Sequence, residues 1–214
     1  MKSMTKFLPI FPLSYVVYPG QPLNLHIFEP RYKELINDCQ SQKITFGIPV
    51  VINDELAEYG TEVEITLIEK IYDNGEMDIR TRGVKVFRVM EVIREVPDKL
   101  YSAAIVFEQK HLPADTTKLN PTLVDLMAQL HSILQTDFDL YKKFSAPTSF
   151  DIAPYAALSQ EDQYRLLMSE SEKGRQWFLI QHLLKLIPHL EDSERLKSRV
   201  QMNGHFRNEI SPNF

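Results

Sequence analysis

Apolar residues alternate with polar residues through most of the first half of the chain, which is the pattern of half-buried β-strands. The alternating or extended runs cover residues 7–18, 23–28, 44–51, 63–71, 77–82, 84–93 and 101–108. The run at 63–71 predicts a strand with one buried and one solvated face. Asp73-Asn74-Gly75 favours a tight hairpin turn, and Gly83 is expected to break the run that follows it. About six strands in this order indicate a small barrel or sandwich.

One helix is expected among these strands, beginning at Pro30. Proline suits the first position of a helix because its missing N–H would have no intrahelical partner there. Tyr32, Leu35, Ile36 and Cys39 then recur at the spacing of one helical face. The single cysteine of the chain therefore falls on an apolar face, which predicts a buried and inert thiol.

From about residue 121 the apolar spacing becomes that of amphipathic helices. Residues 159–162 have the spacing of a capping box ahead of one helix. A longer helix is expected to end at Pro188, and its apolar stripe consists of Trp177, Ile180, Leu184 and Ile187. These patterns predict an α+β protein with a β-rich part at 1–118, a helical part at 119–214 and a linker-like segment at 111–121.

The composition is that of an ordinary globular protein, with 43% hydrophobic and 25% charged residues. The formal net charge is −5, so the sequence lacks the positive footprint that nucleic acid or an anionic membrane surface requires. Pro9 and Pro12 interrupt the apolar stretch after Lys2 and Lys6, which favours a strand of the mature protein over a secretory signal. No apolar run approaches the roughly 20 residues that span a bilayer. We therefore expect a cytoplasmic protein.

The sequence lacks the local signatures of several enzyme classes. It has no Walker phosphate loop and no GxGxxG, GxSxG or HExxH motif. His182 and His189 have no third metal ligand beside them, which favours solvated or capping roles. We predict no catalytic, metal or cofactor site, although an active site assembled from distant residues stays open. An acidic cluster is interpreted as a solvated face rather than a cation site; it consists of Asp54, Glu55, Glu58, Glu62 and Glu64.

Three stretches of the chain stand out as motifs. The first, FPLSYVVYPGQPLNLHIFEPRYKELINDC, contains Tyr18-Pro19-Gly20 and Leu25-His26-Ile27-Phe28-Glu29-Pro30-Arg31-Tyr32. The second, GTEVEITLIEKIYDNGEMDIRTRGVKVFRV, contains Gly60, Gly75 and Gly83, and the third is LSQEDQYRLLMSESEKGRQWFLIQHLLKLI. Together they resemble the Lon substrate-binding domain, the N-terminal region of the ATP-dependent Lon proteases. The resemblance covers about residues 7 to 190.

The resemblance implies a PUA-like six-stranded pseudo-β-barrel with one early helix, followed by a C-terminal α-helical subdomain. It also implies a recognition role, because this region of full-length Lon helps to engage unfolded or tagged substrates. In those proteins the ATPase and Ser-Lys protease domains lie C-terminal to it, and this chain ends before either could begin. We therefore expect a stand-alone Lon-domain protein that is not an enzyme.

The family motif is expected to serve the architecture rather than to contact a ligand. Pro30 begins the helix, and the carboxylate of Glu29 interacts favourably with the positive end of the helix dipole. Arg31 can pair with Glu29 or with a strand carboxylate. His26 is expected on the strand face opposite to the core. The residues interpreted in this structural way are Pro19, Gly20, His26, Ile27, Phe28, Glu29, Pro30, Arg31, Tyr32, Gly60, Gly75 and Gly83.

The expected function is that of a non-catalytic module that engages exposed apolar segments of client or partner proteins, with a separate ATP-dependent protease as a candidate partner. An exposed apolar groove is predicted where the barrel meets the helical part. Tyr15 and Tyr18 are candidates for its lining, with ordinary barrel core as their alternative role. The competing functions are RNA binding by a PUA-like fold and a small enzyme without a visible motif. We expect no nucleic acid, membrane or cofactor as a partner, and a monomer or weak dimer.

Overall fold

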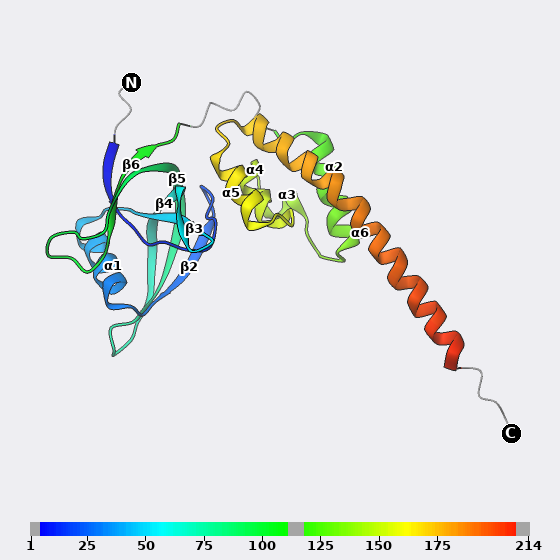
Figure 1. Ribbon diagram of the computed structural model, residues 1–214, viewed down its shortest axis with the longest axis horizontal. Coiled ribbons are helices and arrows are strands. Elements are labelled where there is room, and N and C mark those ends of the chain that lie inside the picture. The colour runs from blue at the N-terminus through cyan, green and yellow to red at the C-terminus, as the bar shows by residue number, and fades with distance from the viewer. Residues whose placement is uncertain (1–4, 111–117, 209–214) are drawn as a thin grey trace.

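The computed structural model describes residues 5–110 and 118–208, with side chains up to residue 196. The strands and the first helix form a barrel-like part, and the remaining helices form a second part beside it (Figure 1). The long last helix extends away from both (Figure 1). Most of the predicted linker at 111–121 lies outside the described residues.

The strands form one antiparallel sheet that curls toward closure. Adjacent strands of the sheet follow the order β1-β6-β5-β4-β3, and β2 pairs with the first part of β5. Parallel bridges from Ile10 to Gly47 and from Leu13 to Val50 lay the chain after β1 along β3, which brings the two ends of the sheet together. The predicted six-stranded pseudobarrel is therefore confirmed. The strands are β1 (Thr5–Pro9), β2 (Pro22–Ile27), β3 (Phe46–Ile52), β4 (Glu55–Ile71), β5 (Met77–Ile93) and β6 (Ala103–Glu108).

The hairpin of β4 and β5 forms the centre of the sheet. Gly75 lies in its turn with a φ of +77°, as the Asn-Gly pair predicted. Gly83 does not break β5, so that prediction was wrong. A Cβ atom at Gly83 would lie 2.1 Å from the carbonyl oxygen of Tyr18. Glycine is needed there because another segment of backbone approaches the strand closely.

The predicted alternation along β4 fails in its second half. Register shifts between β4 and β5 fall within residues 65–70 and reorient the side chains that follow. Leu67 and Ile71 are 50% and 64% exposed, although the pattern placed them on the buried face. Glu62 is buried and pairs with Lys6, so it does not belong to a solvated acidic face.

Helix α1 (Pro30–Gln42) begins at the predicted proline and lies against the strands of the barrel (Figure 1). Leu35, Ile36 and Cys39 are its buried residues and pack in the core cluster that fills the barrel. Burial, together with the charge of Asp38, raises the pKa of the Cys39 thiol to about 12. The prediction of a buried thiol is confirmed.

The helical part begins with α2 and is closed by α6. Ser159 caps α5 because its side chain accepts a hydrogen bond from the backbone N–H of Asp162, as the spacing predicted. The elements are α2 (Pro121–Ile133), α3 (Leu140–Lys143), α4 (Ser149–Ile152), the 3₁₀ turn η1 (Ala153–Tyr155), α5 (Gln160–Met168) and α6 (Glu172–Asn208).

Helix α6 does not end at Pro188 but continues beyond it, which corrects the prediction. Proline removes the N–H that would bond to the carbonyl of Leu184. Both residues are exposed, so water can hydrate that carbonyl. Trp177 and Leu184 were also assigned to the wrong face, because they are 63% and 50% exposed. The buried stripe consists of Leu179, Ile180, Leu183 and Ile187.

The largest hydrophobic cluster is shared by the two parts of the molecule. Four residues of the β-rich part pack in it with the buried residues of α2, α4, α5 and α6. These four are Val16, Tyr18, Val50 and Val86. The barrel and the helices therefore bury their apolar faces against each other.

Candidate functional site

The family motif at the start of α1 places apolar residues inside and charged residues outside. Ile27 is buried, and the ring of Tyr32 packs on Phe11 with 4.1 Å between ring centroids. Glu29 is the N-cap residue, but its side chain makes no capping hydrogen bond. It accepts a hydrogen bond from Arg31 Nε at 2.9 Å instead. The Arg31 and Glu29 side chains are 52% and 37% exposed, so this ion pair is solvated.

His26 joins β2 to the β4–β5 hairpin at the surface. Its Nδ1 lies 2.7 Å from Oδ1 of Asp78, and the hydroxyl of Tyr72 donates to the other oxygen of that carboxylate. The hydrogen bond to Asp78 raises the pKa of His26, and the charge of Glu76 acts in the same direction. Phe28 is 58% exposed and stacks beside the imidazole. These contacts attach β2 to the β4–β5 hairpin.

The turn at Pro19 and Gly20 is fastened to β5. The N–H of Gly20 donates to the carbonyl of Gly83 at 2.8 Å, and the N–H of Gly83 donates to the carbonyl of Gln21 at 2.9 Å. Gly60 likewise meets a neighbouring strand, because a Cβ atom there would lie 2.4 Å from the carbonyl oxygen of Ile48. Each glycine of the motif is thus placed against backbone or in a turn.

The two tyrosines suggested for a binding surface lie in different environments. Tyr18 is 1% exposed and therefore cannot line a surface groove, which corrects that suggestion. Its ring stacks on Phe150 of α4, and burial raises the pKa of its hydroxyl far above the usual range. Tyr15 is 42% exposed, and its hydroxyl accepts a hydrogen bond from Gln21.

Hydrogen bonds between the barrel and the end of the helical part fix the junction. They join strands or their flanking turns to residues of α5, so the shared core is reinforced by polar contacts. The pairs are the Tyr18 hydroxyl to the Gln163 carbonyl (3.1 Å), the Tyr59 N–H to the Tyr164 hydroxyl (3.0 Å), Gln160 Nε2 to the Val51 carbonyl (3.1 Å) and Gln109 Nε2 to the Met168 carbonyl (2.8 Å).

A buried network of polar side chains surrounds the first turn of α6. Glu172 accepts hydrogen bonds from Arg175 at 2.9 Å, from the Ser149 hydroxyl at 2.7 Å and from Gln176 at 2.8 Å. Burial alone would raise the pKa of Glu172, but the hydrogen bonds from Gln176 and Ser149 and the charge of Arg175 hold it below its usual value. The guanidinium of Arg175 also lies 4.1 Å from the ring of Phe150. Sequence reasoning missed this network, because only the spacing of Glu172 and Arg175 hinted at it.

An open groove of about 470 Å³ lies where the sheet meets the connection between α5 and α6. Phe107, Arg88 and Tyr59 are lateral neighbours on β6, β5 and β4, so their side chains share the outer face of the sheet. This groove, called the junction groove below, matches the predicted location between barrel and helices. Its lining consists of Tyr59, Arg88, Met90, Phe107, Gln109, Lys110 and Glu170.

Met90 and Gln109 distinguish the junction groove from an ordinary surface depression. Met90 lies at a register shift in the pairing of β5 with β6 and is 57% exposed. Gln109 is 8% exposed, and its Nε2 donates to the carbonyl of Met168. Its Oε1 has no hydrogen-bond partner among the described residues. The groove therefore combines an exposed flexible apolar side chain with a buried acceptor.

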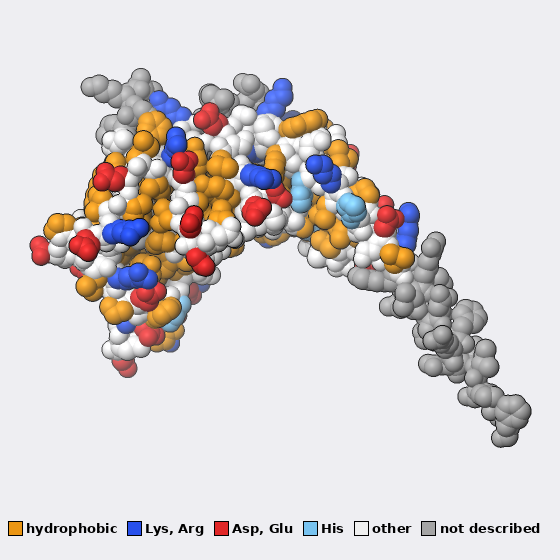
Figure 2. All heavy atoms as spheres, viewed as in Figure 1, with side chains coloured by type: hydrophobic (Ala, Val, Ile, Leu, Met, Phe, Trp, Pro, Cys, Tyr) orange, Lys and Arg blue, Asp and Glu red, His pale blue; other side chains and the backbone are white. Residues whose placement is uncertain are grey.

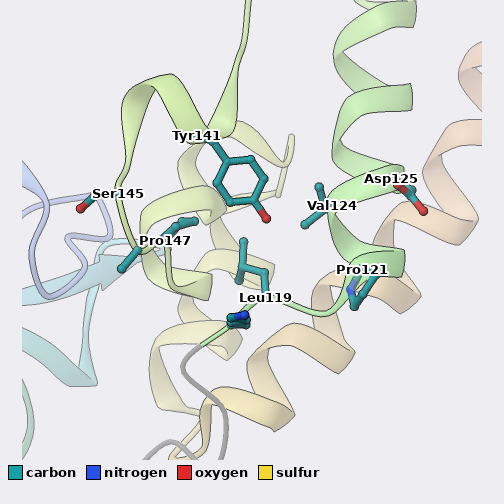
Figure 3. A pocket seen from close by; sticks show the side chains of 9 residues that line it. Leu119, Pro121, Val124, Asp125, Tyr141, Ser145 and Pro147 are labelled. Atoms are coloured by element: carbon teal, nitrogen blue, oxygen red, sulfur yellow. The ribbon is translucent and has the colours of Figure 1, made fainter.

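A second cavity, of about 650 Å³, lies in the helical part between the start of α2 and α3 (Figure 3). Tyr141 is 62% exposed and points between Leu119 and Val124 (Figure 3). A third, of about 560 Å³, follows the outer edge of β4 beside the end of α1, where Leu67 is exposed. Within the described residues, neither is lined by a buried side-chain polar atom that lacks a partner.

The described part of the chain contains neither a cluster of metal-ligating side chains nor a helix suited to span a membrane. Among its His, Cys, Asp and Glu side chains, no group of three or more is arranged to hold a metal ion. None of its helices combines the length and the apolar character needed to cross a membrane.

The arrangement of barrel and helices is shared with solved Lon N-terminal domains. A crystal structure of a Lon N-terminal domain protein from Xanthomonas campestris is 28% identical, with a TM-score of 0.63 over 82% of this chain and 98% of that one. The N-terminal domain of the Mycobacterium avium complex Lon protease has a TM-score of 0.62 over 83% of this chain and 98% of that one. At 18% identity, the second comparison concerns the fold alone. The fold is that of a Lon N-terminal domain.

The family model of the ATP-dependent protease La (LON) substrate-binding domain matches residues 7–193. The chain belongs to this family, and the resemblance seen in its motifs is confirmed. A LON peptidase N-terminal domain and RING finger protein of Schizosaccharomyces pombe is 28% identical in a region that covers 42% of this chain. That region spans only 22% of the yeast protein.

Proposed function

We propose that this chain is a non-catalytic module that recognises other proteins by binding their exposed apolar segments. Its membership of the LON substrate-binding family over residues 7–193 is the observation that carries the proposal. The surface supports it, because hydrophobic side chains gather on the visible face of the barrel among acidic and basic ones (Figure 2). Exposed apolar surface rimmed by polar residues is typical of interaction sites.

The charge distribution favours a protein partner over nucleic acid. The formal net charge is −5. Three arginines on the barrel are already paired with carboxylates: Arg80 with Glu69, Arg82 with Glu64 and Arg88 with Glu58. Paired guanidinium groups offer less charge to phosphates, which supply most of the affinity for nucleic acid.

Equilibrium binding to a permanently unfolded polypeptide tests this function. Reduced and carboxyamidomethylated lactalbumin should bind with a Kd in the micromolar range of weak, transient contacts, and native lactalbumin should not. Apolar contacts are little screened by ions, so the affinity should change little between low and moderate salt. Failure of the unfolded form to bind would contradict the proposal, as would a steep loss of binding with salt.

A further inference from the structure

We infer that the junction groove seats one extended segment of a bound protein, with an apolar side chain of that segment on Met90 and Phe107 and one of its backbone N–H groups donating to Gln109 Oε1. The inference rests on the proposed function and adds to it a location and a set of contacts. Nothing in the family match assigns this groove a role.

The floor of the groove is shaped by an irregularity of β5. The register of β5 against β6 shifts between Val89 and Glu91, and Met90 is the residue without a partner. Such bulges reorient a side chain and are common beside functional sites. Methionine is unbranched and polarisable, so it adapts to side chains of different shape. An exposed Met90 beside Phe107 is therefore suited to apolar residues of varied sequence.

The unpaired acceptor indicates what kind of molecule fits. A buried carbonyl oxygen without a hydrogen bond is costly, and its cost is relieved when a ligand supplies a donor. Nearly every residue of an extended protein segment carries an N–H, whereas a hydrocarbon chain carries none. Gln109 Oε1 is covered in the free protein, so the groups around it must move before a donor of the segment can reach it. The acceptor therefore favours a polypeptide over a lipid.

Two residues that line the groove are bonded to the helical part. The side chain of Gln109 is held by its bond to the Met168 carbonyl, and the backbone N–H of Tyr59 donates to the Tyr164 hydroxyl, so both residues are tied to α5. Lys110 and Glu170 place both signs of charge on the rim, so charge does not select the segment.

Three charge substitutions, one at each cavity, locate the binding surface. Met90→Glu, Tyr141→Glu and Leu67→Glu each place a carboxylate at a side chain that is at least half exposed, so all three variants should fold. We expect Met90→Glu to weaken binding of unfolded lactalbumin about tenfold or more, because apolar contact would bury a charge. The other two variants serve as matched controls and should stay within about twofold of the unmodified protein.

The outcomes separate this inference from the function on which it rests. If the unmodified protein binds and Met90→Glu binds equally well, the groove is the wrong site while the function stands. If the unmodified protein does not bind, both are overturned. A larger loss in Tyr141→Glu or Leu67→Glu than in Met90→Glu would move the site to one of the other cavities and also overturn the inference.

A backbone test addresses the contact with Gln109. A labelled peptide of alternating leucine and serine should bind more tightly than its N-methylated copy, which lacks backbone donors. In Gln109→Met, which keeps the volume but removes the acceptor, the two peptides should bind with more similar affinity than they do to the unmodified protein. An unchanged ratio of affinities would show that Gln109 does not accept a hydrogen bond from the segment. Circular dichroism and thermal melting of the variant confirm that the loss of the bond to Met168 has not unfolded the junction.

Discussion

Arg31 belongs to the most recognisable motif of the sequence, yet its side chain lies half in solvent beside Glu29. Because exposed ion pairs contribute little, Arg31→Ala should lower the free energy of unfolding by at most about 0.5 kcal/mol. Urea denaturation measures this change. A loss of about 1.5 kcal/mol or more would mean that the guanidinium has a buried partner. Unchanged melting combined with weaker binding of unfolded lactalbumin would mean that the motif contacts clients.

At the scale of single residues, the sequence identifies important residues more reliably than it identifies the contacts that make them important. The hairpin turn at Gly75 depends on the positive φ of that one residue, so a short pattern suffices to find it. Gly83 is required because the carbonyl of Tyr18, which is distant in the sequence, lies against it. No local pattern contains that information. Met90 and Gln109 were missed for the same reason, because a register shift and an unpaired acceptor exist only after folding.

At the scale of elements, the start of α6 depends on the buried pair of Glu172 and Arg175. Glu172→Gln should lower the free energy of unfolding by about 3–5 kcal/mol, because it breaks a buried ion pair by removing one of its two charges. Chemical denaturation followed by circular dichroism measures the loss. Arg165→Ala breaks the exposed pair with Asp162 and is the control, with an expected loss of at most about 0.5 kcal/mol.

A double variant completes that test. Replacing Glu172 and Arg175 together by methionine removes both charges, so the combined loss should be smaller than the sum of the losses in Glu172→Met and Arg175→Met measured singly. Additive losses would mean that the two side chains stabilise α6 independently, through Ser149, Gln176 and Phe150 rather than through each other.

The elements also show where periodicity succeeds and where it fails. The start of α1 at Pro30 and the cap of α5 at Ser159 follow from hydrogen-bonding rules that act within one turn. The end of α6 was misplaced because Pro188 does not terminate the helix. The carbonyl that loses its hydrogen bond is exposed and can be hydrated, and packing holds the helix on both sides of the proline. The face of β4 was misassigned after residue 65 because alternation cannot reveal a register shift.

At the scale of the whole molecule, the shared core predicts that barrel and helices unfold together. Phe150 touches Tyr18 of the barrel and Arg175 of α6, and it is buried. Phe150→Ala should cost about 3–5 kcal/mol by leaving a cavity in this core. The loss should appear equally in helical circular dichroism and in the hydrogen exchange of β5 amides. Destabilisation confined to the helices would contradict a single cooperative unit.

The shared core also decides what can be moved from one protein to another. Val16, Tyr18, Val50 and Val86 would face water if the barrel were taken without its helices. A shuffled gene or an engineered fusion that contains only the strands would therefore encode an aggregation-prone, poorly soluble fragment. The unit to be moved is therefore the barrel together with the helices that pack on it, because only the two parts together keep these four side chains covered.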